Sequence, residues 1–193
     1  MKIYDISRTL QDAPLYPGDS PAEVRLVKDV DIGDAYTESS LSFTSHTGTH
    51  VDAPRHFFSD GATVEQMPLA QMCGPCRVLN VPRGLLRQED LMGRLGGVQR
   101  IALRTGGRSW LCEQGAEYLV NCGVKLVVTD AMSIAPEDNE AAVHKILLRA
   151  GVAILENADL DAIPEGDYMI FAFPIKIAGC DGAPVRAVLL GEK

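Results

Sequence analysis

The chain has 193 residues, of which 46% are hydrophobic and 23% charged, and its formal net charge is -8. This composition is that of an ordinary globular protein, and the length predicts one domain, residues 1–193, that can bury about 70% of its unfolded surface. The negative charge and the absence of a Lys/Arg cluster argue against nucleic acid and anionic membrane as partners. No apolar segment approaches the ~20 residues of a membrane-spanning helix.

The N-terminal segment lacks the apolar core of a signal peptide. The chain has five cysteines, an odd number without the spacing of a disulfide framework. Such cysteine usage is typical of a reducing compartment. We therefore expect a cytoplasmic protein.

Local patterns predict many short strands and a few helices. Strands are expected at 2–7, 24–30, 38–44, 77–81, 100–103, 125–129, 152–155, 168–177 and 185–190, with the segment 38–44 half-buried. Helices are expected at 88–94, 113–121 and 137–149, the last with an acidic start and a stop at Gly151. Because strands alternate with helices only late in the chain, we predict an α/β fold with a mixed sheet.

The most informative segment runs from His46 to His56 and reads His-Thr-Gly-Thr-His-Val-Asp-Ala-Pro-Arg-His. It holds three of the four histidines of the chain, and imidazole with carboxylate is a donor set that zinc or manganese accepts. β-Branched residues, Gly48 and Pro54 disfavour a helix. A fully extended chain would separate His46 from Asp52 by roughly 20 Å, so the segment must curl for both to reach one ion. We predict a strand that runs into a tight loop.

The fourth histidine, His144, lies on the predicted helix 137–149 and has apolar neighbours three and four residues away. We therefore expect it to face inward, where a buried histidine needs a polar partner. Glu156 follows the strand 152–155, twelve residues later, and the turn at Gly151 can bring the two side chains together. Alone, the pair is compatible with a structural histidine; beside the first cluster it indicates a second set of ligands.

The pattern His46-x-Gly-Thr-His50-x-Asp52-x-Pro-x-His56 resembles the signature of the metal-dependent cyclase family, which includes bacterial kynurenine formamidase and isatin hydrolase. Softer matches follow in the right order along the chain: Asp5-Ile-Ser7, Tyr16-Pro-Gly-Asp19, Arg104-Thr-Gly106, His144 with Glu156, and Pro174-x-Lys176 with Gly179-x-Asp-Gly182-x-Pro184-x-Arg186-Ala. One departure is Ala135, where relatives usually carry aspartate. The resemblance implies a swivelling β/α/β domain that forms homodimers or homotetramers.

Carried over residue by residue, the resemblance makes His46, His50 and Asp52 ligands of one divalent metal ion, Zn²⁺ or Mn²⁺. Asp52, His144 and Glu156 would hold a second ion, so that Asp52 bridges two ions per subunit. His56 would be the catalytic base and acid. The implied activity is hydrolysis of an amide in a small molecule, as in the conversion of N-formylkynurenine to kynurenine and formate, or of a cyclic amide or lactone.

Two other functional classes remain open from the residues. Cys73-Gly-Pro-Cys76 matches a thioredoxin-type dithiol motif, but that chemistry needs a helix after the first cysteine and the sequence predicts a strand. A non-catalytic metal-binding module would keep the ligands without needing His56, whose presence favours an enzyme. For an enzyme, Tyr16, Phe57 and Phe58 are candidates for the apolar wall of a substrate pocket.

Overall fold

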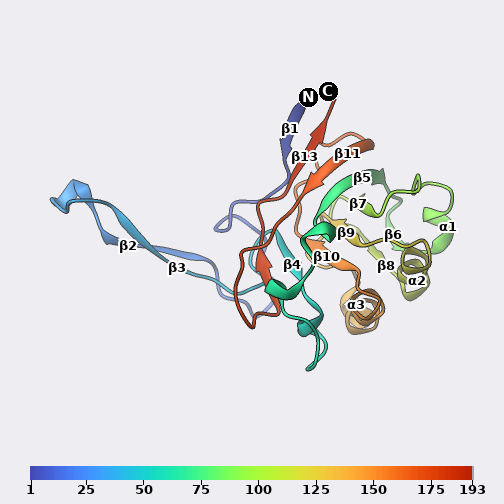
Figure 1. The fold of residues 1–193 in the computed structure, drawn as a ribbon, viewed down its shortest axis with the longest axis horizontal. Coiled ribbons are helices and arrows are strands. Elements are labelled where there is room, and N and C mark those ends of the chain that lie inside the picture. Colours follow the sequence, from blue (N-terminus) through green and yellow to red (C-terminus); the bar gives the residue numbers. More distant parts are fainter. Residues whose placement is uncertain (193) are drawn as a thin grey trace.

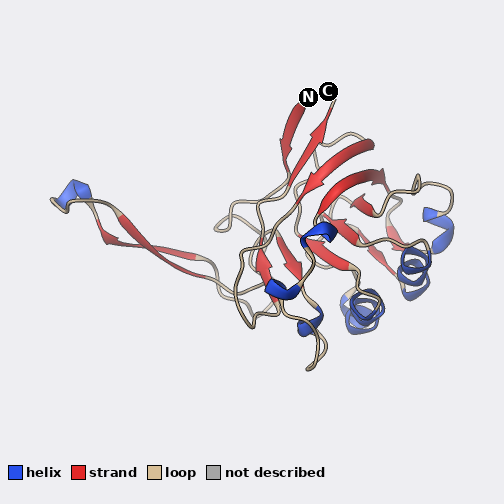
Figure 2. Ribbon diagram, in the orientation of Figure 1, coloured by secondary structure: helices blue, strands red, loops and turns tan. Residues whose placement is uncertain are grey.

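A mixed sheet of nine strands organises the fold, and it curls into a half-barrel with three helices on one side (Figures 1 and 2). The computed structural model describes residues 1–192. In spatial order the strands are β1 (Lys2–Asp5), β13 (Val188–Gly191), β11 (Gly166–Phe171), β5 (Cys73–Asn80), β7 (Arg100–Arg104), β9 (Leu126–Thr129), β10 (Ala153–Glu156), β4 (His50–Asp52) and β12 (Gly182–Pro184).

The centre of the sheet is parallel and its two edges are antiparallel. The four central strands, β5, β7, β9 and β10, run parallel. Between successive strands a helix returns the chain to the end of the sheet where the previous strand began: α1 (Gln88–Leu91), α2 (Glu113–Asn121) and α3 (Glu140–Arg149). A small two-stranded sheet, β6 (Gly84–Leu86) with β8 (Ser109–Leu111), accompanies these crossovers. The predicted single-domain mixed α/β fold is confirmed.

Both faces of the central sheet are buried, and alternate side chains of each strand enter different cores. On β7, Ile101 and Leu103 pack with Leu119 of α2 and Leu147 of α3, whereas Ala102 enters the core on the opposite face. A sheet covered on both faces explains why these strands are uniformly apolar in the sequence. The longest helix of residues 1–192, α3, has 10 residues, and no helix there is long and apolar enough to cross a membrane.

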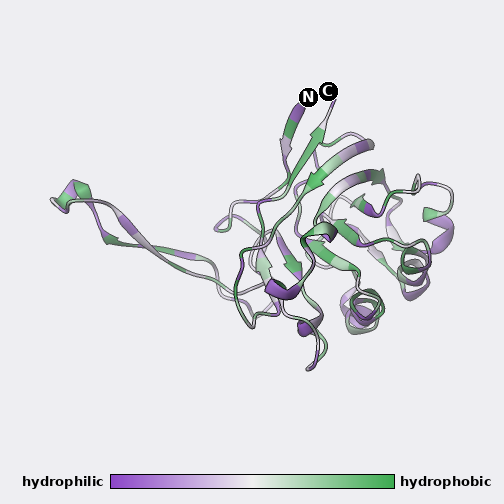
Figure 3. Ribbon diagram, viewed as in Figure 1, coloured by the Kyte–Doolittle hydropathy of each residue, from purple (hydrophilic) through white to green (hydrophobic). Residues whose placement is uncertain are grey.

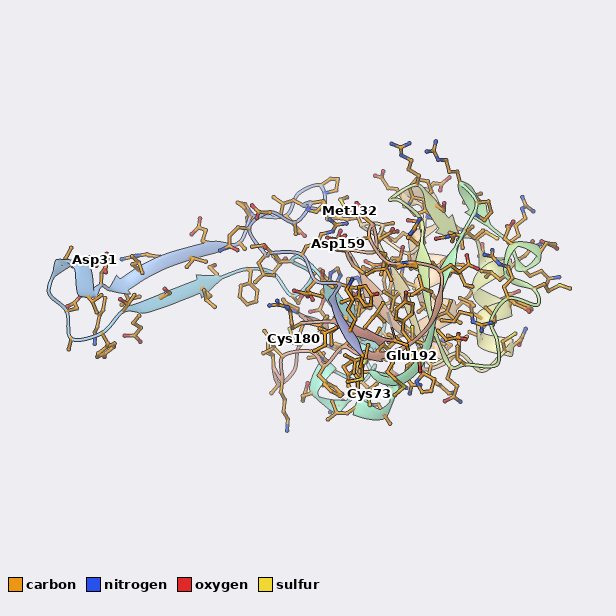
Figure 4. The ribbon with its side chains drawn as sticks, turned by 90° about the horizontal axis from the view of Figure 1, so that it is seen from above. Asp31, Cys73, Met132, Asp159, Cys180 and Glu192 are labelled. Atoms are coloured by element: carbon orange, nitrogen blue, oxygen red, sulfur yellow. The ribbon has the colours of Figure 1, made fainter. Side chains whose placement is uncertain are left out.

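The strand predicted at 38–44 is present over Glu38–Ser42, but the prediction that it is half-buried is wrong. The strand β3 (Glu38–Ser42) pairs only with β2 (Glu23–Lys28), and every residue of β3 is exposed. The two strands and the 3₁₀ turn Val30–Ile32 form an arm, residues 23–42, that projects from the body with Asp31 at its tip (Figures 1 and 4). The alternation of polar and apolar residues around Leu41 correctly indicates an apolar face on this strand. Within the described residues, however, no other element packs against that face.

Other differences concern where elements end. The strand predicted at 168–177 stops at Phe171, and Pro174 makes a single bridge to Val185. The helix predicted at 137–149 begins with a 3₁₀ turn over Glu137–Asn139, and the helix predicted at 88–94 is a single turn, α1. The helix predicted at 113–121 is confirmed residue for residue as α2.

Candidate metal centre

Neighbouring strands place three polar side chains together at one end of the sheet. β10 pairs antiparallel with β4, so that Glu156 lies opposite His50 and Ile154 opposite Asp52. His50, Asp52 and Glu156 therefore share one face, while Val51 points into the hydrophobic core on the other. The same face carries donors from residues that are far apart in the sequence.

The curl predicted for the histidine segment is confirmed, although it precedes the strand. Gly48 adopts a φ of 68°, and a Cβ there would lie 2.8 Å from Leu10 Cδ2. This turn brings His46 back over β4. Gly182 completes the fit, because a Cβ at that position would lie 3.0 Å from His46 Cε1. After the strand, the 3₁₀ turn Pro54–His56 returns His56 toward the same place.

The five predicted metal ligands form one group, here called the histidine cluster: His46, His50, Asp52, His144 and Glu156. Asp52 is central: Oδ1 lies 2.9 Å from His46 Nδ1 and 3.3 Å from His50 Nε2, and Oδ2 lies 3.5 Å from His144 Nε2. Glu156 Oε1 lies 3.2 Å from His144 Nε2, and Oε2 lies 3.6 Å from His50 Nε2. The structure thus brings His144 and Glu156 together, as the sequence predicts.

Backbone hydrogen bonds fix which nitrogen of two histidines faces the carboxylates. His50 Nδ1 donates to the carbonyl of Gly48 at 2.8 Å, and His144 Nδ1 donates to the carbonyl of Glu140 at 2.8 Å. In each neutral ring the Nε2 lone pair is then directed at carboxylate oxygens. His50 Nε2 and Asp52 Oδ2 are buried and have no hydrogen-bond partner. Lone pairs and carboxylates facing each other in a buried site need a cation between them, so these residues fit a divalent metal ion.

The pKa shifts of the cluster residues also indicate that the site favours positive charge. Burial lowers the pKa of His46, but hydrogen bonds to Asp52 and Asp181 and their charges raise it to about 9. Burial likewise opposes protonation of His144, yet Asp52 and Glu156 raise its pKa to about 11. Burial would raise the pKa of Asp52, but the three histidine rings that face its carboxylate outweigh burial and hold the pKa well below its usual value. The carboxylate of Asp52 is therefore ionised and stabilises cations.

His56 differs from the other three histidines in exposure and in the direction of its pKa shift. Its side chain is 31% exposed, and its ring centroid lies 4.1 Å from that of His46. Burial and the charge of His46 lower the pKa of His56, although Asp52 raises it. His56 therefore lies over the cluster as a neutral imidazole that is open to solvent. Its ligand atom is also within 4.8 Å of those of His46 and Asp52, so distance alone also permits coordination.

Asp181 is a polar residue of the site to which the sequence assigned no role. Its Oδ2 accepts hydrogen bonds from His46 Nε2 at 3.0 Å and His56 Nδ1 at 3.3 Å, and its Oδ1 accepts one from Ser45 Oγ at 2.9 Å. The only signal in the sequence was its position beside Gly182 in a motif more than a hundred residues downstream. Because Asp181 binds Nε2 of His46, the other nitrogen of that ring, Nδ1, faces Asp52. Because Asp181 binds Nδ1 of His56, Nε2 is the nitrogen of His56 that remains for other contacts.

A cavity of about 290 Å³, here called the cluster cavity, opens onto the site and is lined in part by His46, His50, His56 and His144. Tyr16 and Phe57 also line it, as predicted. Phe58 does not, because its ring packs under the guanidinium of Arg149 at 4.3 Å. The cluster therefore lies at the bottom of a pocket with an aromatic wall, where a small molecule can reach it.

Comparison with known proteins identifies the family. The model of the Cyclase family matches residues 4–136, more than half of the chain. The chain belongs to the Cyclase family. Among cyclase relatives, kynurenine formamidase of Paracidovorax citrulli is 36% identical over 206 residues, covering 97% of this chain and 95% of that protein. Kynurenine formamidase of Delftia acidovorans is 35% identical over 202 residues, covering 97% of each chain.

Solved structures with a similar fold include two that are named as hydrolases. A potential metal-dependent hydrolase with cyclase activity superposes with a TM-score of 0.85 at 29% identity, covering 97% of this chain and 96% of that one. Isatin hydrolase A from Labrenzia aggregata superposes with a TM-score of 0.84 at 21% identity, covering 99% and 94%. At that identity, the second comparison supports the fold alone.

Proposed function

We propose that the protein is a metal-dependent amide hydrolase that converts N-formylkynurenine to kynurenine and formate. The observation that carries the proposal is the buried histidine cluster, with unpartnered donor atoms, at the bottom of a cavity open to a small molecule. Relatives 33–36% identical over nearly the whole chain are kynurenine formamidases, which supports the choice of substrate.

The five residues of the histidine cluster would hold two divalent ions, Zn²⁺ or Mn²⁺, with Asp52 shared between them. His46 and His50 would complete one site, and His144 and Glu156 the other. Nitrogen and carboxylate donors accept either metal, and availability decides between them. When bound, such ions lower the pKa of water to about 7 and polarise a substrate carbonyl.

His56 supplies the proton transfers in the proposed mechanism. Its Nδ1 is directed at Asp181, so Nε2 accepts the proton of the attacking water. The same nitrogen then donates that proton to the leaving amine when the amide bond breaks. Its lowered pKa keeps the ring neutral and ready to accept a proton. A partly exposed position beside the buried cluster gives it access to both the water and the substrate.

Asp181→Asn is expected to lower kcat by ~10- to 100-fold with a smaller change in KM, because a carboxylate behind a functional histidine fixes its tautomer and orientation. Kinetics in the wild-type and His56→Ala backgrounds test this, since Asp181 should contribute little once His56 is absent. Ser45→Ala removes the hydroxyl that donates to Asp181 Oδ1 without changing a histidine, and should have the smaller effect. An equal loss in both backgrounds would show that Asp181 acts through His46 and the metal instead.

The structure weighs against the alternative of a dithiol oxidoreductase. Cys73 and Cys76 lie on β5 rather than at a helix start, and burial raises the pKa of the Cys76 thiol to about 12. A cyclic amide or lactone remains a second candidate substrate, favoured by the shared fold of isatin hydrolase A. A non-catalytic metal-binding module would leave the position of His56 over the cavity without a role.

The direct test is to purify the protein, measure its metal content, and follow formate release from N-formylkynurenine with and without Zn²⁺ or Mn²⁺. Bound metal with rapid formate release would support the proposal. Bound metal without turnover would move the substrate to a cyclic amide or lactone. Failure to bind metal under any condition would overturn it.

We also infer a homodimer or homotetramer, and the arm supports this assembly. An isolated two-stranded hairpin is marginally stable in water, and three or more strands or a packing partner are normally required. The arm nevertheless exposes apolar side chains: Val24, Leu26, Val27, Val30, Ile32, Tyr36 and Leu41. In Figure 3 its ribbon has hydrophobic stretches among hydrophilic ones. A second copy of the chain would cover them.

Replacing both Leu26 and Ile32 with Glu is expected to shift the protein toward a monomer of about 20.8 kDa, because charges would then enter the covered surface. Light scattering after size-exclusion chromatography measures the mass. Leu69→Glu is the control, since Leu69 is 62% exposed but lies on the body. An unchanged mass for the arm variant would contradict the role of the arm.

Two further assignments belong to the proposal. The swivelling β/α/β arrangement implied by the family is supported by the mixed sheet with helices between its parallel strands. A cytoplasmic location is supported by the cysteines, all five of which are free thiols.

A further inference from the structure

A second cavity, here called the side chamber, adjoins the cluster cavity. Its volume is about 580 Å³, and the two cavities share Tyr16, Met132, Glu140 and Asn157 as walls. Figure 4 shows Met132 on the side of the body that faces the base of the arm. Together the cavities can hold a molecule larger than the amide that reacts over the histidine cluster.

Arg8 is the single basic residue among those that line the side chamber. Its backbone N–H donates to Thr49 Oγ1 at 2.9 Å, and Thr49 lies between two of the cluster histidines in the sequence. Its Nη2 donates to the carbonyl of Ala158 at 3.1 Å. Arg8 is therefore held by the same segment that carries the metal ligands.

The guanidinium of Arg8 is incompletely paired. Its Nε is buried without a hydrogen-bond partner, and none of the ion pairs formed by residues 1–192 involves Arg8. A half-buried guanidinium without an anion is costly, and its planar array of donors matches a carboxylate. The chamber thus presents a site for an anionic group of a ligand.

The acidic residues of the chamber differ in their availability. Asp130 accepts hydrogen bonds from the backbone N–H groups of Thr105 and Gly106, and Glu140 accepts one from the hydroxyl of Tyr16. Glu137 and Asp161 also line the chamber, and their carboxylates suit an ammonium group. Ala135 also lines the chamber and adds no charge to this wall. One guanidinium beside carboxylates is the complement of a zwitterionic α-amino acid.

We propose that the side chamber binds the amino-acid end of the substrate and that Arg8 pairs with its carboxylate while the scissile amide lies in the cluster cavity. This inference rests on the proposed amide hydrolysis and narrows its substrates to aryl amides that carry an α-amino acid. Arg8 is then a specificity-determining residue that takes no part in the bond-breaking step.

The test compares two substrates that differ only in the carboxylate, N-formylkynurenine and N-formylkynuramine. Wild-type enzyme should prefer the first by ~10- to 100-fold in kcat/KM, the size expected for one charge-assisted hydrogen-bonded pair. Arg8→Ala should lose that preference while hydrolysing N-formylkynuramine at the wild-type rate, which also shows that the variant is folded. Arg8→Lys should restore part of the preference, and Arg83→Ala, at an exposed arginine outside the chamber, should leave it unchanged.

A binding measurement separates this inference from the proposed reaction. Trp110 is the only tryptophan and lines the side chamber, so its fluorescence reports occupancy by kynurenine or kynuramine without turnover. If neither formamide is hydrolysed but kynurenine binding weakens only in Arg8→Ala, the chamber assignment stands and the proposed function fails. The inference would be overturned if the wild type had the same kcat/KM for both substrates, or if Arg8→Ala lowered kcat/KM equally for both. It would also be overturned if neither substrate were hydrolysed and Trp110 fluorescence did not respond to kynurenine.

Discussion

Asp52→Asn is expected to abolish metal binding and to reduce hydrolysis by at least ~10³-fold, since loss of even one preorganised charge-stabilising donor costs ~10²–10³-fold. Asp52 is fully buried and its two oxygens contact three histidines within 3.5 Å. Asparagine keeps the shape of the side chain but removes its negative charge. Metal analysis of the purified variant, together with kcat/KM for N-formylkynurenine, measures both effects.

Asp60→Asn is the matched control, because Asp60 is an exposed residue on the loop that follows the histidine segment. It should retain the metal content and activity of the wild type. Circular dichroism of Asp52→Asn distinguishes a folded, metal-free protein from an unfolded one. A folded Asp52→Asn protein that still binds two ions would remove Asp52 from its bridging position.

The sequence predicted those helices and strands that a local pattern of apolar residues marks. In the helix 113–121 a repeat of 3.6 residues decides which side chains are buried. The strands at 100–103 and 125–129 are recognisable as short apolar runs, because both faces of the central sheet are covered. The histidine segment was equally visible, because metal-type donors are concentrated there and Gly48 marks a turn. These signals are local, and tertiary contacts reinforce them.

Features that depend on distant residues could not be predicted in the same way. The arm has an amphipathic pattern like that of a half-buried strand, but burial depends on whether another element packs on it. Asp181 approaches His46 and His56 only because β12 pairs with β4, a contact between segments 130 residues apart in the register Gly182–Asp52. Arg8 likewise lines the side chamber only through contacts with Thr49 and Ala158.

His56→Ala is expected to retain the metal content of the wild type but to lose ~10²–10⁴-fold in kcat, the usual contribution of general acid–base catalysis. The reason is its position: its side chain is 31% exposed over the cluster, whereas the side chains of His50 and His144 are 3% and 2% exposed. Added imidazole should partly restore the rate, because alanine leaves space beside the cavity for a free base.

Metal content decides between the two roles that the geometry allows for His56. As a base and acid, it can be removed without loss of an ion, because His46, His50, Asp52, His144 and Glu156 provide the donors. As a ligand with His46 and Asp52, its removal would lower the metal content or affinity together with the rate. Retained metal with a slow, imidazole-rescued reaction supports proton transfer; full activity would exclude His56 from the mechanism altogether.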